Sequence, residues 1–221
     1  MENERVRKIV EILKLKRNIV GIHFLVCEKD FQECDAEIFK GRLRLCGFVN
    51  KANYGAKMKV KQDNFACMGA AGQTGLIQPA ESFLSGQRRK HSGLYSDLGI
   101  AREVSESFKR IPYSLYGMEI GPLEDMDSAD VVIILGMAEQ IMKIMQGYTW
   151  HYGTPHNLVS VGNAAMCSDM VSKPFMNNDI NLSLMCCGAR TSTISEEGEL
   201  GVGMPSHIFK QVADGILKIY N

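Results

Sequence analysis

The segment Asp130-Val-Val-Ile-Ile-Leu-Gly136 decides the fold class, because an unbroken apolar run ends there in a glycine. Such a run is typical of a strand that is buried on both faces of a sheet. Residues 137–151 follow, and Ile141 and Ile144 lie on the apolar stripe of a predicted amphipathic helix. A strand, a glycine and a helix in this order begin a βαβ unit, so the sequence predicts an α/β protein.

Apolar periodicity predicts further strands and helices on both sides of this segment. The β-forming run at 19–26 predicts a second central strand, in which His23 is expected to be a core histidine with one hydrogen-bond partner. Other predicted strands cover residues 57–61, 158–161, 180–184 and 200–203. Predicted amphipathic helices cover residues 4–16, 37–54, 101–110 and 205–220. The sequence therefore predicts one or more mixed sheets that are packed by helices.

The chain of 221 residues is long enough to bury a real core, and we expect a single domain, 1–221. It is predicted to consist of two similar α/β halves, approximately 1–115 and 125–221. Residues 112–127, which contain a Gly-Pro pair and a run of acids, are expected to connect the halves.

An internal pseudo-repeat supports this division. The predicted helix over 37–54 corresponds to the helix over 137–151, and Cys67-Met-Gly-Ala70 corresponds to Cys186-Cys-Gly-Ala189. The second half then carries an insertion, residues 162–179. If the halves face each other about a pseudo-twofold axis, the two Cys-x-Gly-Ala motifs approach each other.

Composition argues against several classes of partner. Lys and Arg number 25 and Asp and Glu number 25, whereas general binding to nucleic acid or to an acidic membrane usually needs a basic surplus. No apolar run approaches the ~20 residues of a membrane span. The charged start, Met1–Lys8, does not resemble a secretory signal, so we expect a cytoplasmic protein without nucleic-acid or membrane partners.

Seven cysteines are the chain's most informative residues. In the reducing cytoplasm they could be packing residues, a nucleophilic or redox thiol, or metal ligands. Cys27 and Cys34 flank a charged loop and are expected to be peripheral. The remaining thiols lie on predicted helices or in glycine-marked turns: Cys46, Cys67, Cys167, Cys186 and Cys187. Because no C-x-x-C spacing occurs, only the folded chain could bring these thiols together.

A metal centre is the first interpretation of the five thiols. An iron–sulfur cluster needs about four thiolates, and these cysteines supply them with one of Cys186 and Cys187 to spare. Arg190 could neutralise a negatively charged cluster or bind an anionic substrate. Gly69 and Gly188 could let the backbone approach a bound group closely. The alternatives for the cofactor are zinc or none.

Two other classes of function remain open. In a thiol enzyme, Cys167 near a helix start would be the nucleophile, with Asp169 and a histidine from elsewhere in the chain. In a small-molecule-binding module, the cysteines would be structural. A redox partner protein, a small-molecule ligand and a homodimer are all compatible with these interpretations. The basic cluster Arg88–Lys90, in the polar stretch 79–93, is expected to be a solvated turn.

The chain resembles an archaeal cysteine-rich family of unknown function that occurs in archaea and anaerobic bacteria. The resemblance covers most of the chain, and Cys186-Cys-Gly-Ala-Arg190 is its most specific motif. The other matching motifs are Leu45-Cys46, Ala66-Cys67-Met-Gly69-Ala70, Asp130–Gly136, Gln146-Gly-Tyr148-Thr and Cys167-Ser-Asp169. The resemblance implies an α/β domain and points to iron–sulfur or other metal binding, without an established reaction. We therefore expect a redox or electron-transfer role.

Overall fold

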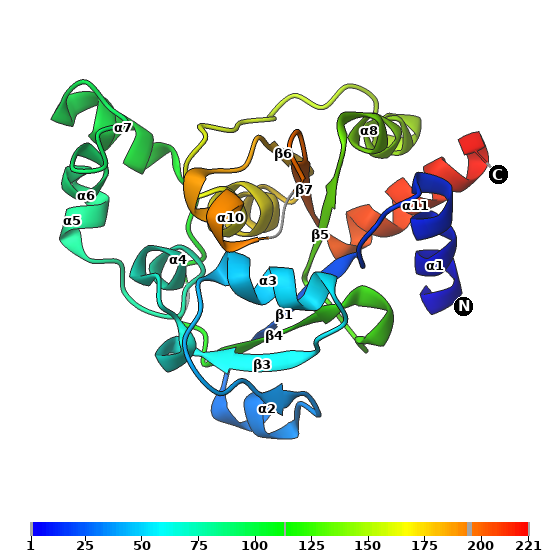
Figure 1. Ribbon diagram of the computed structural model, residues 1–221, viewed down its shortest axis with the longest axis horizontal. Coiled ribbons are helices and arrows are strands. Elements are labelled where there is room, and N and C mark those ends of the chain that lie inside the picture. The colour runs from blue at the N-terminus through cyan, green and yellow to red at the C-terminus, as the bar shows by residue number, and fades with distance from the viewer. Residues whose placement is uncertain (1, 113, 194–195, 221) are drawn as a thin grey trace.

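The computed structural model describes residues 2–112, 114–193 and 196–220 (Figure 1). The strands are β1 Val20–Leu25, β2 Glu37–Ile38, β3 Met58–Lys61, β4 Gly117–Pro122, β5 Val131–Gly136, β6 Asn181–Ser183 and β7 Leu200–Pro205. The longer helices are α1 Glu2–Leu13, α3 Leu45–Asn53, α7 Leu98–Ser107, α8 Ala138–Tyr152 and α11 Ser206–Tyr220. The short helices are α2 Glu28–Glu33, α4 Met68–Gln73, α5 Glu81–Leu84, α6 Gln87–Lys90, α9 Lys173–Asn177 and α10 Cys187–Ser192. Two 3₁₀ turns, η1 Gln62–Asn64 and η2 Leu123–Asp125, and a π-helix, η3 Ala165–Ser172, complete the described elements.

The described strands form one mixed sheet in the order β2-β3-β4-β1-β5-β7-β6. β2 and β3 are parallel, and every other neighbouring pair is antiparallel. The predicted α/β class with mixed sheet is confirmed. The simple βαβ unit predicted after β5 is not formed, because the antiparallel strand β7 lies between β5 and the parallel strand β6.

Two predicted segments differ from the structure. Residues 112–127, expected to be a connection, contain β4, which is fully buried between β3 and β1. Two glycines and a proline in this strand conceal the periodicity that would have predicted it. Residues 158–161, expected to be a strand, are not paired with the sheet, although the Val159 amide donates to the Asn181 side chain at 2.8 Å.

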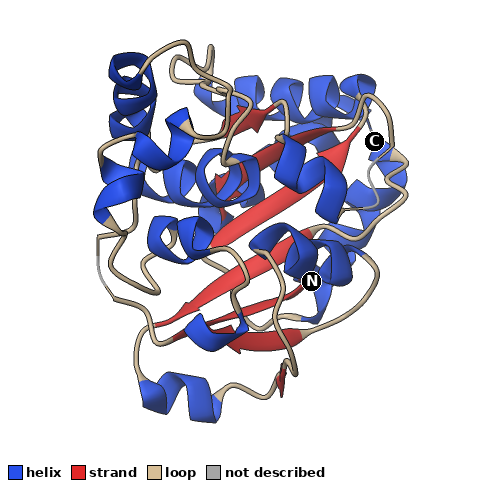
Figure 2. Ribbon diagram, turned by 60° about the vertical axis from the view of Figure 1, so that its left-hand side comes forward, coloured by secondary structure: helices blue, strands red, loops and turns tan. Residues whose placement is uncertain are grey.

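The two sides of the sheet carry separate cores. Along β5, Val131, Ile133 and Leu135 face one core, and Val132 and Ile134 face the other, as the alternation of a strand requires. We call the side covered by α1, α8 and α11 the apolar face. The opposite side, covered by α3, α4, η3 and α10, is called the thiol face. Helices lie on both sides of the sheet in Figure 2.

The internal repeat is not confirmed. Outward from the central pair β1 and β5, the strand orders β1-β4-β3 and β5-β7-β6 do correspond. The helices predicted to be equivalent do not, because α3 packs on the thiol face and α8 on the apolar face. Residues 162–179, expected to be an insertion, form η3 and α9, and η3 joins α3 on the thiol face.

Glycines allow the close packing on each face. A Cβ atom at Gly203 of β7 would clash with the backbone of Met170, so this glycine lets η3 lie directly on the sheet. On the apolar face, a Cβ at Gly215 would clash with the backbone of Gly147, where α11 crosses α8. The π-helix begins after Ala164 in a left-handed conformation with φ of 53°.

Residues 80–107 project from the body as an arm that consists of α5, α6 and α7, at the upper left of Figure 1. Gly86, with φ of +80°, lies against the backbone of Ala101 and Arg102 and holds α6 to α7. The predicted polar loop therefore contains two helices of four residues each. No helix among the described residues has the length and apolarity needed to cross a membrane.

Candidate functional site

One cavity on the thiol face brings all five predicted thiols together. Its volume is about 640 Å³, and it lies between the body and the arm. The thiols that line it are Cys46, Cys67, Cys167, Cys186 and Cys187. Cys27 is exposed and Cys34 is half-buried, and neither lines this cavity. The five thiols singled out from the sequence thus line one cavity, and the two expected to be peripheral lie outside it.

Four of these thiols come from the beginnings of four helices. Cys46 is the second residue of α3, and Cys167 is the third residue of η3. Cys67 caps the N-terminus of α4, and Cys186 caps the N-terminus of α10. Because α3 packs on α10 and α4 packs on η3, helix starts that are up to 140 residues apart in sequence point into one space.

The four sulfurs interact electrostatically. Burial raises the pKa of the Cys167 thiol, and the neighbouring Cys67, Cys186 and Cys46 raise it further. Burial also raises the pKa of Cys46, with Cys186 as an additional cause. Burial therefore favours the protonated forms of the Cys46 and Cys167 thiols.

Weak hydrogen bonds orient three of the sulfurs, and one of these bonds joins the Cys167 thiol to the Ala164 carbonyl at 3.6 Å. The Cys46 thiol donates to the Gly188 carbonyl at 3.6 Å, which ties α3 to α10. The Cys186 sulfur accepts a hydrogen bond from the Ala189 amide at 3.4 Å. Cys187 differs from its neighbour because it is exposed, and it is not among the causes of the raised pKa of Cys46 or of Cys167, whereas Cys186 is. Cys186 is therefore the inward thiol of the pair, and Cys187 lies at the rim.

The three other predicted binding residues lie in different places. Gly69 lines the cavity, and a Cβ there would lie 2.8 Å from the Phe83 ring of the arm. Gly188 also lines it, beside the Arg44 guanidinium. Arg190 is not among the lining residues, and its guanidinium donates to the Leu184 and Glu199 carbonyls at 3.1 and 3.3 Å. Arg190 thus fixes the turn around α10.

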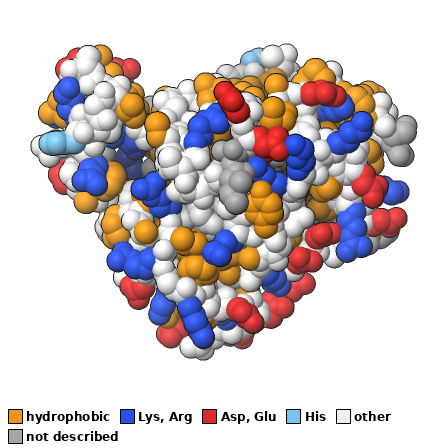
Figure 3. Space-filling view, viewed as in Figure 1, with side chains coloured by type: hydrophobic (Ala, Val, Ile, Leu, Met, Phe, Trp, Pro, Cys, Tyr) orange, Lys and Arg blue, Asp and Glu red, His pale blue; other side chains and the backbone are white. Residues whose placement is uncertain are grey.

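Three arginines that the sequence did not single out line the cavity: Arg44, Arg88 and Arg89. Arg89 was expected in a solvated turn, but it stacks 4.0 Å over the Phe108 ring and donates from Nε to Ser105 at 2.9 Å. Figure 3 shows Lys and Arg side chains beside the hollow between the arm and the body. The described lining residues include no Asp, Glu or His.

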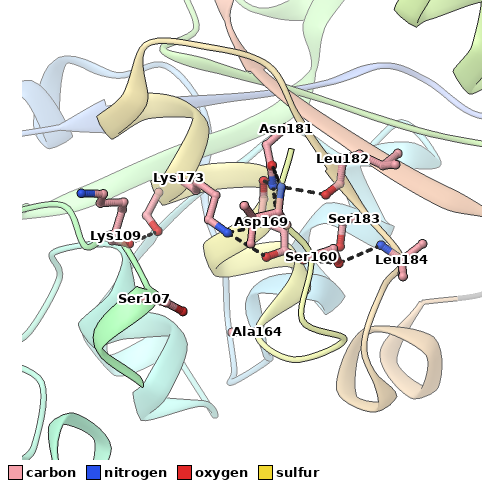
Figure 4. A network of polar contacts seen from close by, with 12 residues as sticks. Ser107, Lys109, Ser160, Ala164, Asp169, Lys173, Asn181, Leu182, Ser183 and Leu184 are labelled. Atoms are coloured by element: carbon pink, nitrogen blue, oxygen red, sulfur yellow. Dashed lines mark hydrogen bonds and ion pairs between the residues drawn. The ribbon is translucent and has the colours of Figure 1, made fainter. Parts of the chain in front are cut away.

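A buried polar network lies behind the cavity (Figure 4). The Asp169 carboxylate is fully buried and accepts hydrogen bonds from Ser160 and Ser183 at 2.8 and 2.9 Å. Its second oxygen lies 3.8 Å from the Lys173 ammonium. Burial raises the pKa of Asp169 to about 6. The network connects η3, which carries Cys167, to the strand that precedes Cys186.

A second group of potential metal ligands is already satisfied by protein. The donor atoms of Cys34, Asp35 and Glu119 lie within 4.8 Å of one another. Lys57 forms ion pairs with Asp35 at 2.9 Å and with Glu119 at 3.3 Å, so its ammonium group occupies the position that a cation would need. This group is a structural ion-pair cluster.

Comparison with known proteins identifies the family. The pattern of the family described as "Uncharacterised ArCR", domain of unknown function 169, matches residues 8–215. The chain is also 21% identical to the protein named Uncharacterized protein MJ0308 from Methanocaldococcus jannaschii over 216 residues, which cover 96% of this chain and 92% of that protein. No solved structure matches the chain. Since the family pattern spans nearly all of the fold and every cavity thiol, the chain belongs to the archaeal cysteine-rich family.

Proposed function

We propose that the cavity binds a four-iron, four-sulfur cluster and that the protein transfers or senses electrons. The ligands would be the four inward thiols of Cys46, Cys67, Cys167 and Cys186. The observation that carries the proposal is their convergence from four separate helix starts. Sulfur is the donor that iron–sulfur clusters prefer, and the described lining offers no competing carboxylate or imidazole.

The spacing of the cavity sulfurs argues against a single zinc ion. Within the described chain, no three cavity sulfurs lie within 4.8 Å of one another. A tetrahedral zinc site with bonds of ~2.3 Å needs sulfurs about 3.8 Å apart. A cubane holds its four ligand sulfurs roughly 6–7 Å apart, because the iron atoms separate them. A single zinc ion would therefore require the helix starts to move closer together, whereas a cubane accommodates wider separations.

The electrostatics of the cavity are also suited to a negatively charged group. A four-thiolate cubane carries about two negative charges in its oxidised state. Arg44 and Arg89 interact electrostatically with Cys46 and Cys167, respectively, and in each case lower the pKa of the thiol. These arginines would stabilise the thiolates that a cluster requires.

A bound cluster would supply one-electron redox chemistry, and the protein would control access to it. Cys187 and Met68 are exposed at the rim of the cavity, so a partner protein could approach the bound group from this side. Cys187 would remain a spare thiol.

The thiol-enzyme interpretation has less support. The raised pKa of Cys167 is the opposite of what an activated nucleophile needs. Asp169 accepts hydrogen bonds from two serines, and no histidine is among the described lining residues.

Anaerobic reconstitution tests the proposal. The full chain is incubated with ferric iron, a thiol reductant and sulfide, desalted, and analysed for iron, sulfide and visible absorption. We expect four irons and four sulfides per chain, together with the broad absorption at roughly 400 nm that is typical of a cubane. Serine substitution at any of the four inward cysteines should remove most of this iron, whereas Cys34→Ser should not.

Two results would refute the proposal. One is a reconstituted wild-type chain without stoichiometric iron and sulfide, including a chain that holds one zinc ion. The other is equal iron loss in Cys34→Ser and in the variants of the inward thiols. Circular dichroism of each variant establishes that it is folded before iron is counted.

A further inference from the structure

We propose that the arm side of the same cavity binds a small organic carboxylate through Arg88 and Arg89. The site goes beyond the cluster, because a different part of the chain carries it, and only its preference for a monoanion rests on the proposed cluster. The arm supplies one wall of the cavity: Ala80, Ser82, Phe83, Arg88, Arg89 and Leu94. The thiols line the opposite wall, from α3, α4, η3 and α10.

Arg89 is held in position before any ligand binds. Its guanidinium stacks on Phe108 at 4.0 Å, and Nε donates to the Ser105 hydroxyl at 2.9 Å. This bond uses Nε, so it does not occupy the two terminal nitrogens of Arg89, a residue that lines the cavity. A guanidinium fixed in this way binds a planar carboxylate through two parallel hydrogen bonds with little loss of entropy.

The arm arginines have no acidic partner within the described chain. None of the ion pairs among the described residues includes Arg88 or Arg89, and no lining residue is acidic. Burial lowers the pKa of Arg89, which shows that part of its hydration has been removed. A desolvated cation without a counter-charge favours an anionic ligand.

Charge favours a monoanion. Three arginines line the cavity and bring three positive charges. A four-thiolate cubane would neutralise about two of them. The remaining single charge matches a carboxylate better than a phosphate dianion.

Size and polarity define the remainder of the ligand. The cavity of about 640 Å³ lies within the range of roughly 300–1,000 Å³ that is usual for small-molecule pockets, and a cluster would fill only part of it. Phe83 and Leu94 lie on the same wall as the arginines. These side chains suit an aromatic or branched aliphatic group attached to the carboxylate.

The arm is also joined to the wall that carries Cys167. The Asn163 amide donates to the Tyr95 hydroxyl of the arm at 3.2 Å, and Asn163 lines the cavity two residues before η3. A carboxylate bound by Arg89 would therefore lie beside the thiol with which Arg89 interacts electrostatically.

Calorimetric titration of the full chain tests the inference. Benzoate is the probe, with inorganic phosphate and benzyl alcohol as comparisons, and each is titrated into the chain before and after anaerobic reconstitution. In the reconstituted chain, we expect benzoate to bind more tightly than phosphate and benzyl alcohol not to bind. Arg88→Gln and Arg89→Gln should each weaken benzoate binding about tenfold or more, since each removes charged hydrogen bonds.

Arg102→Gln is the matched control, because Arg102 is an exposed arginine of the arm that does not line the cavity. It should leave the benzoate affinity unchanged. If Arg89→Gln fails to fold, Arg88→Gln still decides the question, because Arg88 is exposed.

Three outcomes would overturn the inference. They are absence of benzoate binding in both forms of the chain, unchanged binding in Arg88→Gln, and tighter binding of phosphate than of benzoate in the reconstituted chain. Arginine-dependent benzoate binding by a chain that takes up no iron would leave this inference standing and refute only the cluster.

Discussion

The apolar face and the thiol face of the sheet are built from different kinds of helix. Helices α8 and α11 of the apolar face have 15 residues each and pack through regular apolar stripes. On the thiol face, α3 has nine residues, α4 and α10 have six each, and η3 is a π-helix. Short helices place many helix starts side by side, and four of these starts carry the inward thiols.

The two faces also differ in their buried polar groups. Ser168, Asp169 and Ser172 of η3 are fully buried on the thiol face. The Ser168 hydroxyl and one Asp169 oxygen have no hydrogen-bond partner among the described residues. Buried polar groups cost stability when they are unsatisfied. The comparison indicates that the apolar face stabilises the fold. The buried polar groups of the thiol face lower that stability, and the helix starts of the same face position the sulfurs.

Removal of a side chain from the apolar face should have the largest effect on stability. Ile144 of α8 is fully buried, and Ile144→Ala should lower the free energy of unfolding by about 3–4 kcal/mol because it leaves a cavity. Urea unfolding measures the change. Iron content per folded chain should stay the same after reconstitution, and a loss of iron would show that the two faces are not separate in function.

Gly203→Ala tests how tightly the thiol face is seated on the sheet. The added methyl group would meet the Met170 backbone, so we expect a loss of about 2–3 kcal/mol and lower iron content, because η3 carries Cys167. Gly121→Ala is the control, since its nearest neighbour is the flexible Lys57 side chain. Equal unfolding curves for the two variants would contradict the close packing of η3 against β7.

The buried network around Asp169 should contribute less to the free energy of unfolding than the packing of Ile144 or Gly203. Asp169→Ala leaves the Ser160 and Ser183 hydroxyls without their acceptor, and should lower the free energy of unfolding by about 2 kcal/mol. Asp169→Asn keeps an acceptor oxygen and should be destabilised by about half as much. Thermal unfolding measures the stability of both variants. An alanine variant that is more stable than the asparagine variant would argue against the network.

The smallest expected change in stability is the pH-dependent contribution of His23 on β1. His23 Nδ1–H donates a hydrogen bond to the Asp130 carboxylate at 2.9 Å, and this hydrogen bond raises the pKa of His23 above its ordinary 6.5. A raised histidine pKa stabilises the fold fully below the unfolded pKa, and this contribution is lost as the pH rises through the folded pKa.

His23→Gln removes this titration. The difference in unfolding free energy between the wild-type chain and the variant should therefore shrink as the pH rises above 6.5. It should stay below about 1 kcal/mol, because both side chains are 33% exposed. A difference that grows with pH would contradict the assignment.

Sequence periodicity predicted the long elements of both faces. The strands β1 and β5 and the helices α8 and α11 have continuous apolar runs or stripes, and the structure contains them near the predicted bounds. The helix predicted over 37–54 is shorter, because residues 37–38 form β2 and α3 starts at Leu45. Short elements leave too few residues for a period to be detected.

The candidate site was predictable in part, because its thiols lie in local sequence motifs whereas its arginines do not. A predicted helix placed Cys46, and glycine-marked turns placed Cys67, Cys167, Cys186 and Cys187, since these local motifs do not depend on distant contacts. The cavity arginines were missed because Arg88 and Arg89 lie on a helix of four residues, and only the packing of the arm directs them toward the thiols. The π-helix that presents Cys167 has no distinct sequence signal.

Native mass spectrometry of the anaerobically reconstituted chain tests the central claim most directly. If four thiols on the thiol face hold one cubane, the wild-type chain gains about 350 Da, the mass of four irons and four sulfides. Cys46→Ser, Cys67→Ser, Cys167→Ser and Cys186→Ser should each lose this gain, and Cys27→Ser should retain it. A wild-type chain with no added mass, or with the mass of one zinc ion, would contradict the account.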